Sequence, residues 1–137
     1  MTSRRADVFF YGLFMDAELL RSQGVRPEGG ELASVAGFAL RIGHRAALVP
    51  RVGARVYGLV FSLTLSDLKR LYADPSVRAY VPQPVLAELA GGGVIAALCY
   101  NLPQPPATTE RNPEYLAQLR ALGQRVGLPA EYLESLQ

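Results

Sequence analysis

The chain has 137 residues, of which half are hydrophobic and 19% are charged, and its formal net charge is +2. This composition excludes a disordered chain and suits one domain with a sizeable core over residues 1–137. No stretch approaches the ~20 apolar residues that span a bilayer. No motif or dense basic cluster accompanies the charge, so we expect no nucleic-acid partner and no membrane partner.

Cellular location follows from the cysteine content and the N-terminus. Cys99 is the only cysteine, so the chain has no internal disulfide, and we expect a reducing compartment. Cys99 lies in an apolar run, which favours a small buried residue over a nucleophile. The segment from Met1 to Asp7 precedes an apolar run too short for a signal peptide. We therefore expect a cytoplasmic protein.

The first predicted elements are a strand, a glycine turn and a helix. Val8 to Tyr11 is aromatic and β-branched, as in a buried strand. Gly12 then allows a backbone conformation closed to other residues, and Asp16 is a good cap for a helix over residues 17–21 that Gly24 ends. Such a junction leaves several backbone N–H groups pointing into one space, which suits a carboxylate or an oxyanion. The alternative is an ordinary strand-to-helix turn.

The rest of the chain alternates apolar runs with proline and glycine turns. Strands are predicted over residues 31–42, 46–49, 55–63, 79–89 and 94–100, with a turn at residues 51–54. Thr64 or Ser66 caps a short helix whose inner face ends at Tyr72. Asn112 caps a helix that Gly127 closes, and a last helix begins after Pro129. Strands that follow one another without regular helix crossovers indicate an α+β fold with a mixed sheet that can curl into a small barrel.

One segment of the chain is basic throughout. Residues 41–55 hold four arginines and His44 and no acidic residue. One interpretation is that the segment binds an anion. The other is that its arginines lie on the solvent face of a strand, because Arg41 and Arg45, like Arg51 and Arg55, are an even number of residues apart and so share one face.

The order of motifs resembles the γ-glutamylcyclotransferase-like family, which has the avirulence-induced-gene-like fold. The turn Tyr11-Gly12-Leu13-Phe14-Met15 resembles the family's signature turn after the first strand. Further resemblances follow in family order over residues 36–40, 49–61, 68–80, 112–115 and 127–132. The resemblance covers almost the whole chain and implies a small mixed β-barrel with flanking helices.

The resemblance also implies a reaction. In that chemistry the α-amine of a small γ-glutamyl amine or amino-acid conjugate attacks its own γ-glutamyl carbonyl and releases 5-oxoproline and an amine. One carboxylic group moves the proton, backbone N–H groups hold the substrate, and ring closure within one molecule needs no metal and no cofactor. The implied partner is a small γ-glutamyl or carboxylate ligand; the sequence does not indicate an oligomeric state.

Asp74 is the candidate for the proton transfer. It is the only acid between Asp67 and Glu88, on the loop where the resemblance implies a catalytic glutamate. Two features depart from the family pattern: aspartate is one methylene shorter than glutamate, and a strict count from Leu71 places the acid at Pro75. The alternative is a turn residue before proline.

The candidate substrate-binding residues are Tyr11, Gly12, Leu13, Phe14, Met15 and Tyr80. Leu13 stands where the family commonly has serine or threonine, so one side-chain hydrogen bond worth roughly 0.5–1.5 kcal/mol is absent and a more apolar substrate is favoured. Tyr80 either contacts the ligand or packs in a strand. Two functions therefore remain open: a cyclotransferase-like enzyme, or a non-catalytic small-ligand-binding domain of the same fold.

Overall fold

The structure, a computed structural model, describes residues 4–137, so the start of the N-terminal segment lies outside it. Its elements in chain order are β1 (Arg5–Phe10), the 3-10 helix η1 (Leu13–Met15), α1 (Ala17–Ser22), β2 (Glu28–Ile42), β3 (Ala46–Thr64), α2 (Leu65–Leu71), β4 (Val81–Leu89), β5 (Val94–Asn101), α3 (Pro113–Val126) and α4 (Ala130–Ser135). Within the described range, no helix has the length and apolar character to cross a membrane.

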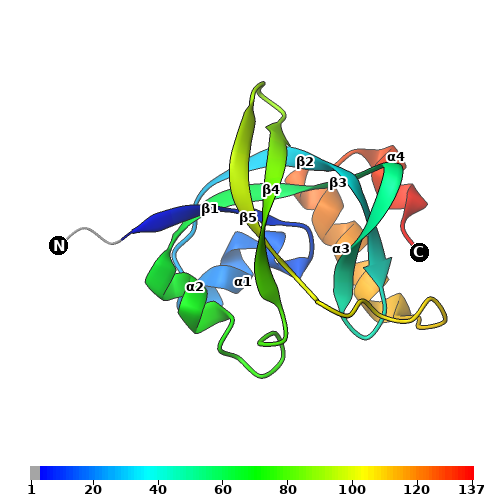
Figure 1. Cartoon of the computed structure of the whole chain (residues 1–137), viewed down its shortest axis with the longest axis horizontal. Coiled ribbons are helices and arrows are strands. Elements are labelled where there is room, and N and C mark those ends of the chain that lie inside the picture. Colours follow the sequence, from blue (N-terminus) through cyan, green and yellow to red (C-terminus); the bar gives the residue numbers. More distant parts are fainter. Residues whose placement is uncertain (1–3) are drawn as a thin grey trace.

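The strands form a closed barrel in the order β1-β3-β2-β4-β5 (Figure 1). All neighbours pair antiparallel except β1 and β5, which pair parallel where Val8 lies opposite Leu98 and so close the barrel. The β4–β5 hairpin projects beyond the barrel, and the helices flank it. The predicted α+β fold with a mixed barrel is confirmed.

Strand β3 differs from the sequence prediction. Two strands were expected at residues 46–49 and 55–63, but β3 runs through both and pairs with β2 on either side of residues 51–54. These residues bulge opposite Gly37, where Ala36 pairs with Arg55 and Phe38 pairs with Pro50. Gly37 and Gly53 both have positive φ, of 86° and 81°, which allows the backbone to leave and rejoin the ladder.

The helix boundaries follow the predicted caps. The Asp16 carboxylate accepts hydrogen bonds from the N–H groups of Glu18 and Leu19 at the start of α1. Thr64, rather than Ser66, caps α2. The αL residue Gly127, with φ of 92°, ends α3.

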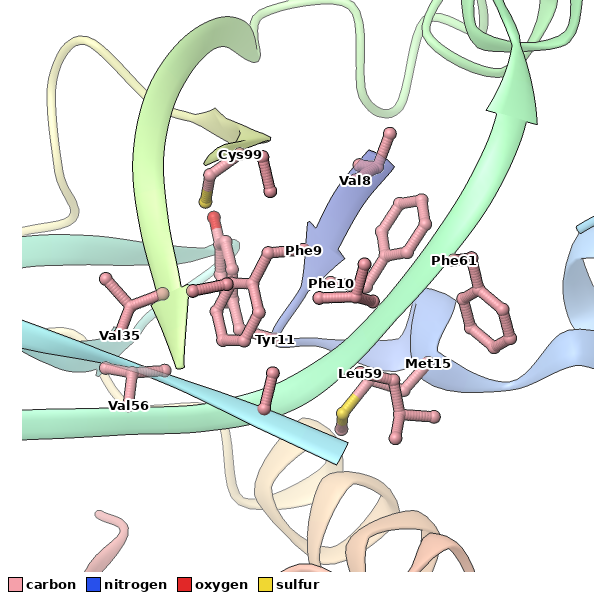
Figure 2. Close-up of a cluster of buried hydrophobic side chains, with 14 of the residues drawn as sticks. Val8, Phe9, Phe10, Tyr11, Met15, Val35, Val56, Leu59, Phe61 and Cys99 are labelled. Atoms are coloured by element: carbon pink, nitrogen blue, oxygen red, sulfur yellow. The ribbon is translucent and has the colours of Figure 1, made fainter. Parts of the chain in front are cut away.

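The core lies inside the barrel and beneath the helices that flank it. Strand β1 contributes Val8, Phe9 and Phe10, all at most 3% exposed (Figure 2). Burying one such side chain contributes roughly 1.5–3 kcal/mol. Strand β1 pairs with β3 on one side and β5 on the other, and its side chains are buried in this core. The turn that follows β1 is therefore held in a fixed position.

Candidate functional site

A cavity of about 350 Å³ opens at the end of β1. Its wall combines the turn after β1, the turn between β2 and β3, the loop after α2, and side chains from β5 and α3. The lining residues are Phe9, Phe10, Tyr11, Gly12, Leu13, Phe14, Leu19, His44, Arg45, Ala46, Tyr72, Ser76, Val77, Tyr80, Tyr100 and Tyr115. Three phenylalanines and five tyrosines make it a largely aromatic cavity.

Most of the predicted binding residues line this cavity. Tyr11, Gly12, Leu13 and Phe14 form one side, and Tyr80 approaches from the loop before β4. Met15 does not line it: the side chain is buried, with 1% exposure, and belongs to the hydrophobic core. The structure therefore brings distant parts of the predicted site together, with Met15 in a packing role.

Gly12 is needed for space rather than for its own conformation. Its φ of −120° and ψ of −150° are extended, so the predicted special conformation is wrong. A Cβ at this position would lie 2.6 Å from the Tyr115 hydroxyl oxygen. A real Cβ does not approach an oxygen that closely, so a side chain here would require the α3 tyrosine to move.

The turn offers fewer free backbone donors than the sequence suggested. The Met15 and Asp16 N–H groups donate to the carbonyls of Gly12 and Leu13. Burial raises the pKa of Tyr115, whose hydroxyl lies against this turn, above its usual range. Two amides of the turn thus already have partners inside the protein.

Hydrogen bonds and stacking fix several tyrosines of the cavity wall. Tyr11 donates to the Tyr100 carbonyl at 2.9 Å, and Tyr80 donates to the Ala46 carbonyl. Tyr72 stacks on Tyr100, with ring centroids 3.9 Å apart and planes 7° from parallel. These bonds and contacts hold the aromatic rings as a rigid wall.

Cys99 lies behind this wall, and Figure 2 shows its sulfur directed toward the Tyr11 hydroxyl. The residue is 0% exposed, and burial raises the pKa of its thiol to about 12. A buried thiol with such a pKa is protonated near neutral pH and is not a nucleophile. The predicted packing role of Cys99 agrees with this position.

Asp74 does not enter the cavity. Its side chain is exposed, and its carboxylate accepts hydrogen bonds from the Ser76 N–H at 2.9 Å and the Ser76 hydroxyl at 2.6 Å. Both bonds lower the pKa of Asp74, opposite to what a proton-transferring acid requires. The expectation that this carboxyl faces the glycine turn is wrong, because the bonds to Ser76 hold it in a local turn.

Among residues 4–137, none of those lining the cavity is an aspartate or a glutamate. The lining residues include one arginine, Arg45, which lies beside His44 on the turn between β2 and β3. Burial raises the pKa of Tyr80 to about 12, and the nearby Arg45 charge acts against this rise. In the part of the chain that the structure describes, no group of three or more His, Cys, Asp or Glu side chains is placed to hold a metal.

Sequence reasoning missed several lining residues. Tyr72, Tyr100 and Tyr115 were not among the candidate binding residues, yet all three line the cavity. His44 and Arg45 belong to the acid-free stretch at residues 41–55, for which anion binding was one of the two interpretations. The three tyrosines carried no comparable signal, since aromatic residues in strands and helices usually pack.

The family model described as "Gamma-glutamyl cyclotransferase, AIG2-like" matches residues 8–118. The chain belongs to this family. No curated protein matches the sequence. The resemblance inferred from the ordered motifs is thus confirmed for the family, which does not by itself assign a reaction to this member.

Solved structures of the family share the fold. A structure named gamma-glutamyl cyclotransferase has a TM-score of 0.80 and 21% identity, covering 96% of this chain and 85% of that chain. An uncharacterized protein from Homo sapiens has a TM-score of 0.78 and 23% identity, covering 95% and 85%. An aig2-like protein from Mus musculus has a TM-score of 0.52 and 18% identity, covering 82% and 83%. At these identities the likeness extends to the fold.

Proposed function

We propose that this member of the γ-glutamyl cyclotransferase family binds a small carboxylate-bearing molecule, such as a γ-glutamyl compound, without carboxylate-driven catalysis. The observation that carries the proposal is an aromatic cavity with Arg45 at its wall and no acidic lining residue among residues 4–137. The apolar rings contact the body of the ligand, and the guanidinium of Arg45 binds its carboxylate.

The absence of a carboxylate among the described lining residues argues against carboxylate-driven cyclisation. A general acid/base must lie within hydrogen-bond reach of the reacting atoms and have a pKa near the working pH. Asp74 is exposed with a lowered pKa. Burial raises the pKa of Tyr11 and Tyr72 far above neutrality, so neither phenol serves as a base.

The second candidate is the γ-glutamylcyclotransferase reaction itself, with Asp74 as general acid/base. Family membership favours it, and so does one contact: Ser76 lines the cavity and donates its hydroxyl proton to Asp74. A change in the loop after α2 would have to bring the carboxyl to the cavity.

One pair of measurements separates the two candidates. A panel of γ-glutamyl amines is tested for 5-oxoproline release by mass spectrometry and for binding by calorimetry, with the wild type and Asp74→Asn. We expect both proteins to bind alike and neither to turn over. Turnover by the wild type that Asp74→Asn abolishes would establish the enzyme instead.

Arg45→Gln tests the binding mode. Loss of a charge-assisted hydrogen bond worth roughly 1.5–3 kcal/mol predicts binding weaker by about 10- to 100-fold. Arg78→Gln is the matched control, because Arg78 is exposed and does not line the cavity. Equal affinities in the two variants would refute the proposed role of Arg45.

A further inference from the structure

A second cavity, of about 470 Å³, lies between the β2–β3 hairpin and the loop before α3. Its lining residues are Ala39, Leu40, Arg41, Ile42, Val49, Pro50, Arg51, Ala107, Thr108, Glu110, Arg111 and Gln137. It shares no lining residue with the aromatic cavity. The hairpin carries part of the acid-free stretch at residues 41–55. The sequence left two interpretations of that stretch, an anion-binding site and the solvent-exposed face of a strand.

The loop that forms one wall of this second cavity is firmly attached to the hairpin. Pro106 is buried, and a Cβ added at Gly43 would lie 2.5 Å from its Cβ. The Arg41 guanidinium donates to the Pro106 carbonyl at 3.3 Å. The cavity is therefore a built feature of the fold, with walls from two segments far apart in the sequence.

The charges in the second cavity do not balance. Among the side chains that line it, three are guanidinium groups, from Arg41, Arg51 and Arg111, and one is a carboxylate, from Glu110. Each Glu110 carboxylate oxygen is held by a backbone N–H, from His44 at 3.1 Å and from Ala107 at 2.8 Å. These bonds lower the pKa of Glu110, so its charge persists near neutral pH and one acid faces three bases.

The three arginines retain donors for a ligand. Arg111 uses one nitrogen to donate to the carbonyls of Thr108 and Glu110, and Arg41 uses one nitrogen for Pro106. A guanidinium has five N–H donors, so each keeps others. Among the described residues, none of the three takes part in an ion pair, unlike Arg5, Arg55, Arg70 and Arg125.

We propose that this second cavity binds a small, multiply charged anion through Arg41, Arg51 and Arg111. The ligand class is a small molecule with two or more phosphate or carboxylate groups, because guanidinium forks bind either group through paired hydrogen bonds. The cavity has the volume of a small-molecule site, and its lining side chains carry a net charge of about +2. The proposal is independent of the function assigned to the aromatic cavity.

Calorimetric titration with pyrophosphate and, separately, with citrate tests this site at constant ionic strength. We expect saturable binding of at least one of the two probes, and the stronger one identifies phosphate or carboxylate as the preferred group. Arg51→Gln and Arg111→Gln should each weaken binding by about tenfold or more. Arg41 is left intact because it also holds the loop.

Arg21→Gln is the matched control, since Arg21 is an exposed arginine of α1 that lines neither cavity. It removes the same charge and should leave the affinity unchanged. The melting temperature of each variant without anion shows that the fold is intact. Absence of saturable binding to both probes, or equal weakening by Arg21→Gln, would overturn the proposal.

Discussion

At the scale of single residues, the contact between Gly12 and Tyr115 decides the shape of the candidate site. The glycine lies on the turn after β1, and the tyrosine is in the first turn of α3 near the other end of the chain. The Tyr115 hydroxyl occupies the space where a Cβ would lie. The sequence suggested that Gly12 is needed for its backbone conformation. In the structure the side chain of Tyr115, from a distant part of the chain, is what requires a glycine there.

The substitution Gly12→Ala should therefore destabilise the protein only while the Tyr115 hydroxyl is present. Overpacking at this contact is expected to lower the free energy of unfolding by about 1–3 kcal/mol, measured by urea denaturation. In a Tyr115→Phe background the nearest atom is the ring carbon Cζ at 3.9 Å, an ordinary contact, so Gly12→Ala should then cost little. The same loss in both backgrounds would contradict the steric explanation.

At the scale of elements, the start of α3 fixes the turn between β2 and β3. The Asn112 side chain accepts a hydrogen bond from the Tyr115 N–H at 3.1 Å and donates one to the Gly43 carbonyl at 3.1 Å. One residue thus caps the helix that carries Tyr115 and holds the turn that carries His44 and Arg45. Two walls of the aromatic cavity depend on it.

Asn112→Ala should consequently lower the free energy of unfolding by more than the loss of a helix cap alone. Asp16→Ala at α1 is the reference: it removes two cap hydrogen bonds and a weak exposed ion pair with Arg125 and should cost about 1 kcal/mol. Asn112→Ala additionally loses the bond to Gly43, so about 2 kcal/mol is expected. Both values come from urea denaturation. Equal losses in the two variants would show that the bond to Gly43 contributes nothing.

At the scale of the whole molecule, buried phenols link stability to alkaline pH. Burial raises the pKa of Tyr11, Tyr72, Tyr115 and Tyr132 above the usual tyrosine range, and that of Tyr80 to about 12. The Tyr132 hydroxyl is buried without a hydrogen-bond partner in the described structure. Folding therefore favours the neutral form of each of these groups.

Stability should thus be lost in the alkaline range. Below the ordinary tyrosine pKa of about 10 the phenols are neutral in both states and their contribution is fully present. Above it the unfolded chain ionises first, so the free energy of unfolding falls as pH rises toward the folded-state values. Urea denaturation at pH 8 to 11, with tyrosinate absorbance of the folded protein, measures this. Constant stability over that range, with all tyrosines titrating near 10, would contradict the assigned burial.

Local patterns predicted the elements well because their causes are local. Caps such as Asp16 and Asn112 and the αL glycine Gly127 act within one turn of the chain, and the helices they bound appear where expected. The continuity of β3 was not predicted because it depends on pairing with another strand: residues 51–54 bulge opposite Gly37 of β2. The position of Asp74 was missed because its bonds to Ser76 compete with the expected orientation toward the cavity.

The sequence by itself determined the family and the mixed barrel, together with the glycine turn at the end of its first strand. These follow from apolar spacing, turn residues and the order of short motifs, all of which can be read along the chain. Only the tertiary structure decided that Tyr72, Tyr100 and Tyr115 surround that turn while Asp74 faces solvent. The physical reason is that the lining residues come from several segments far apart in the sequence, and barrel closure brings these segments together.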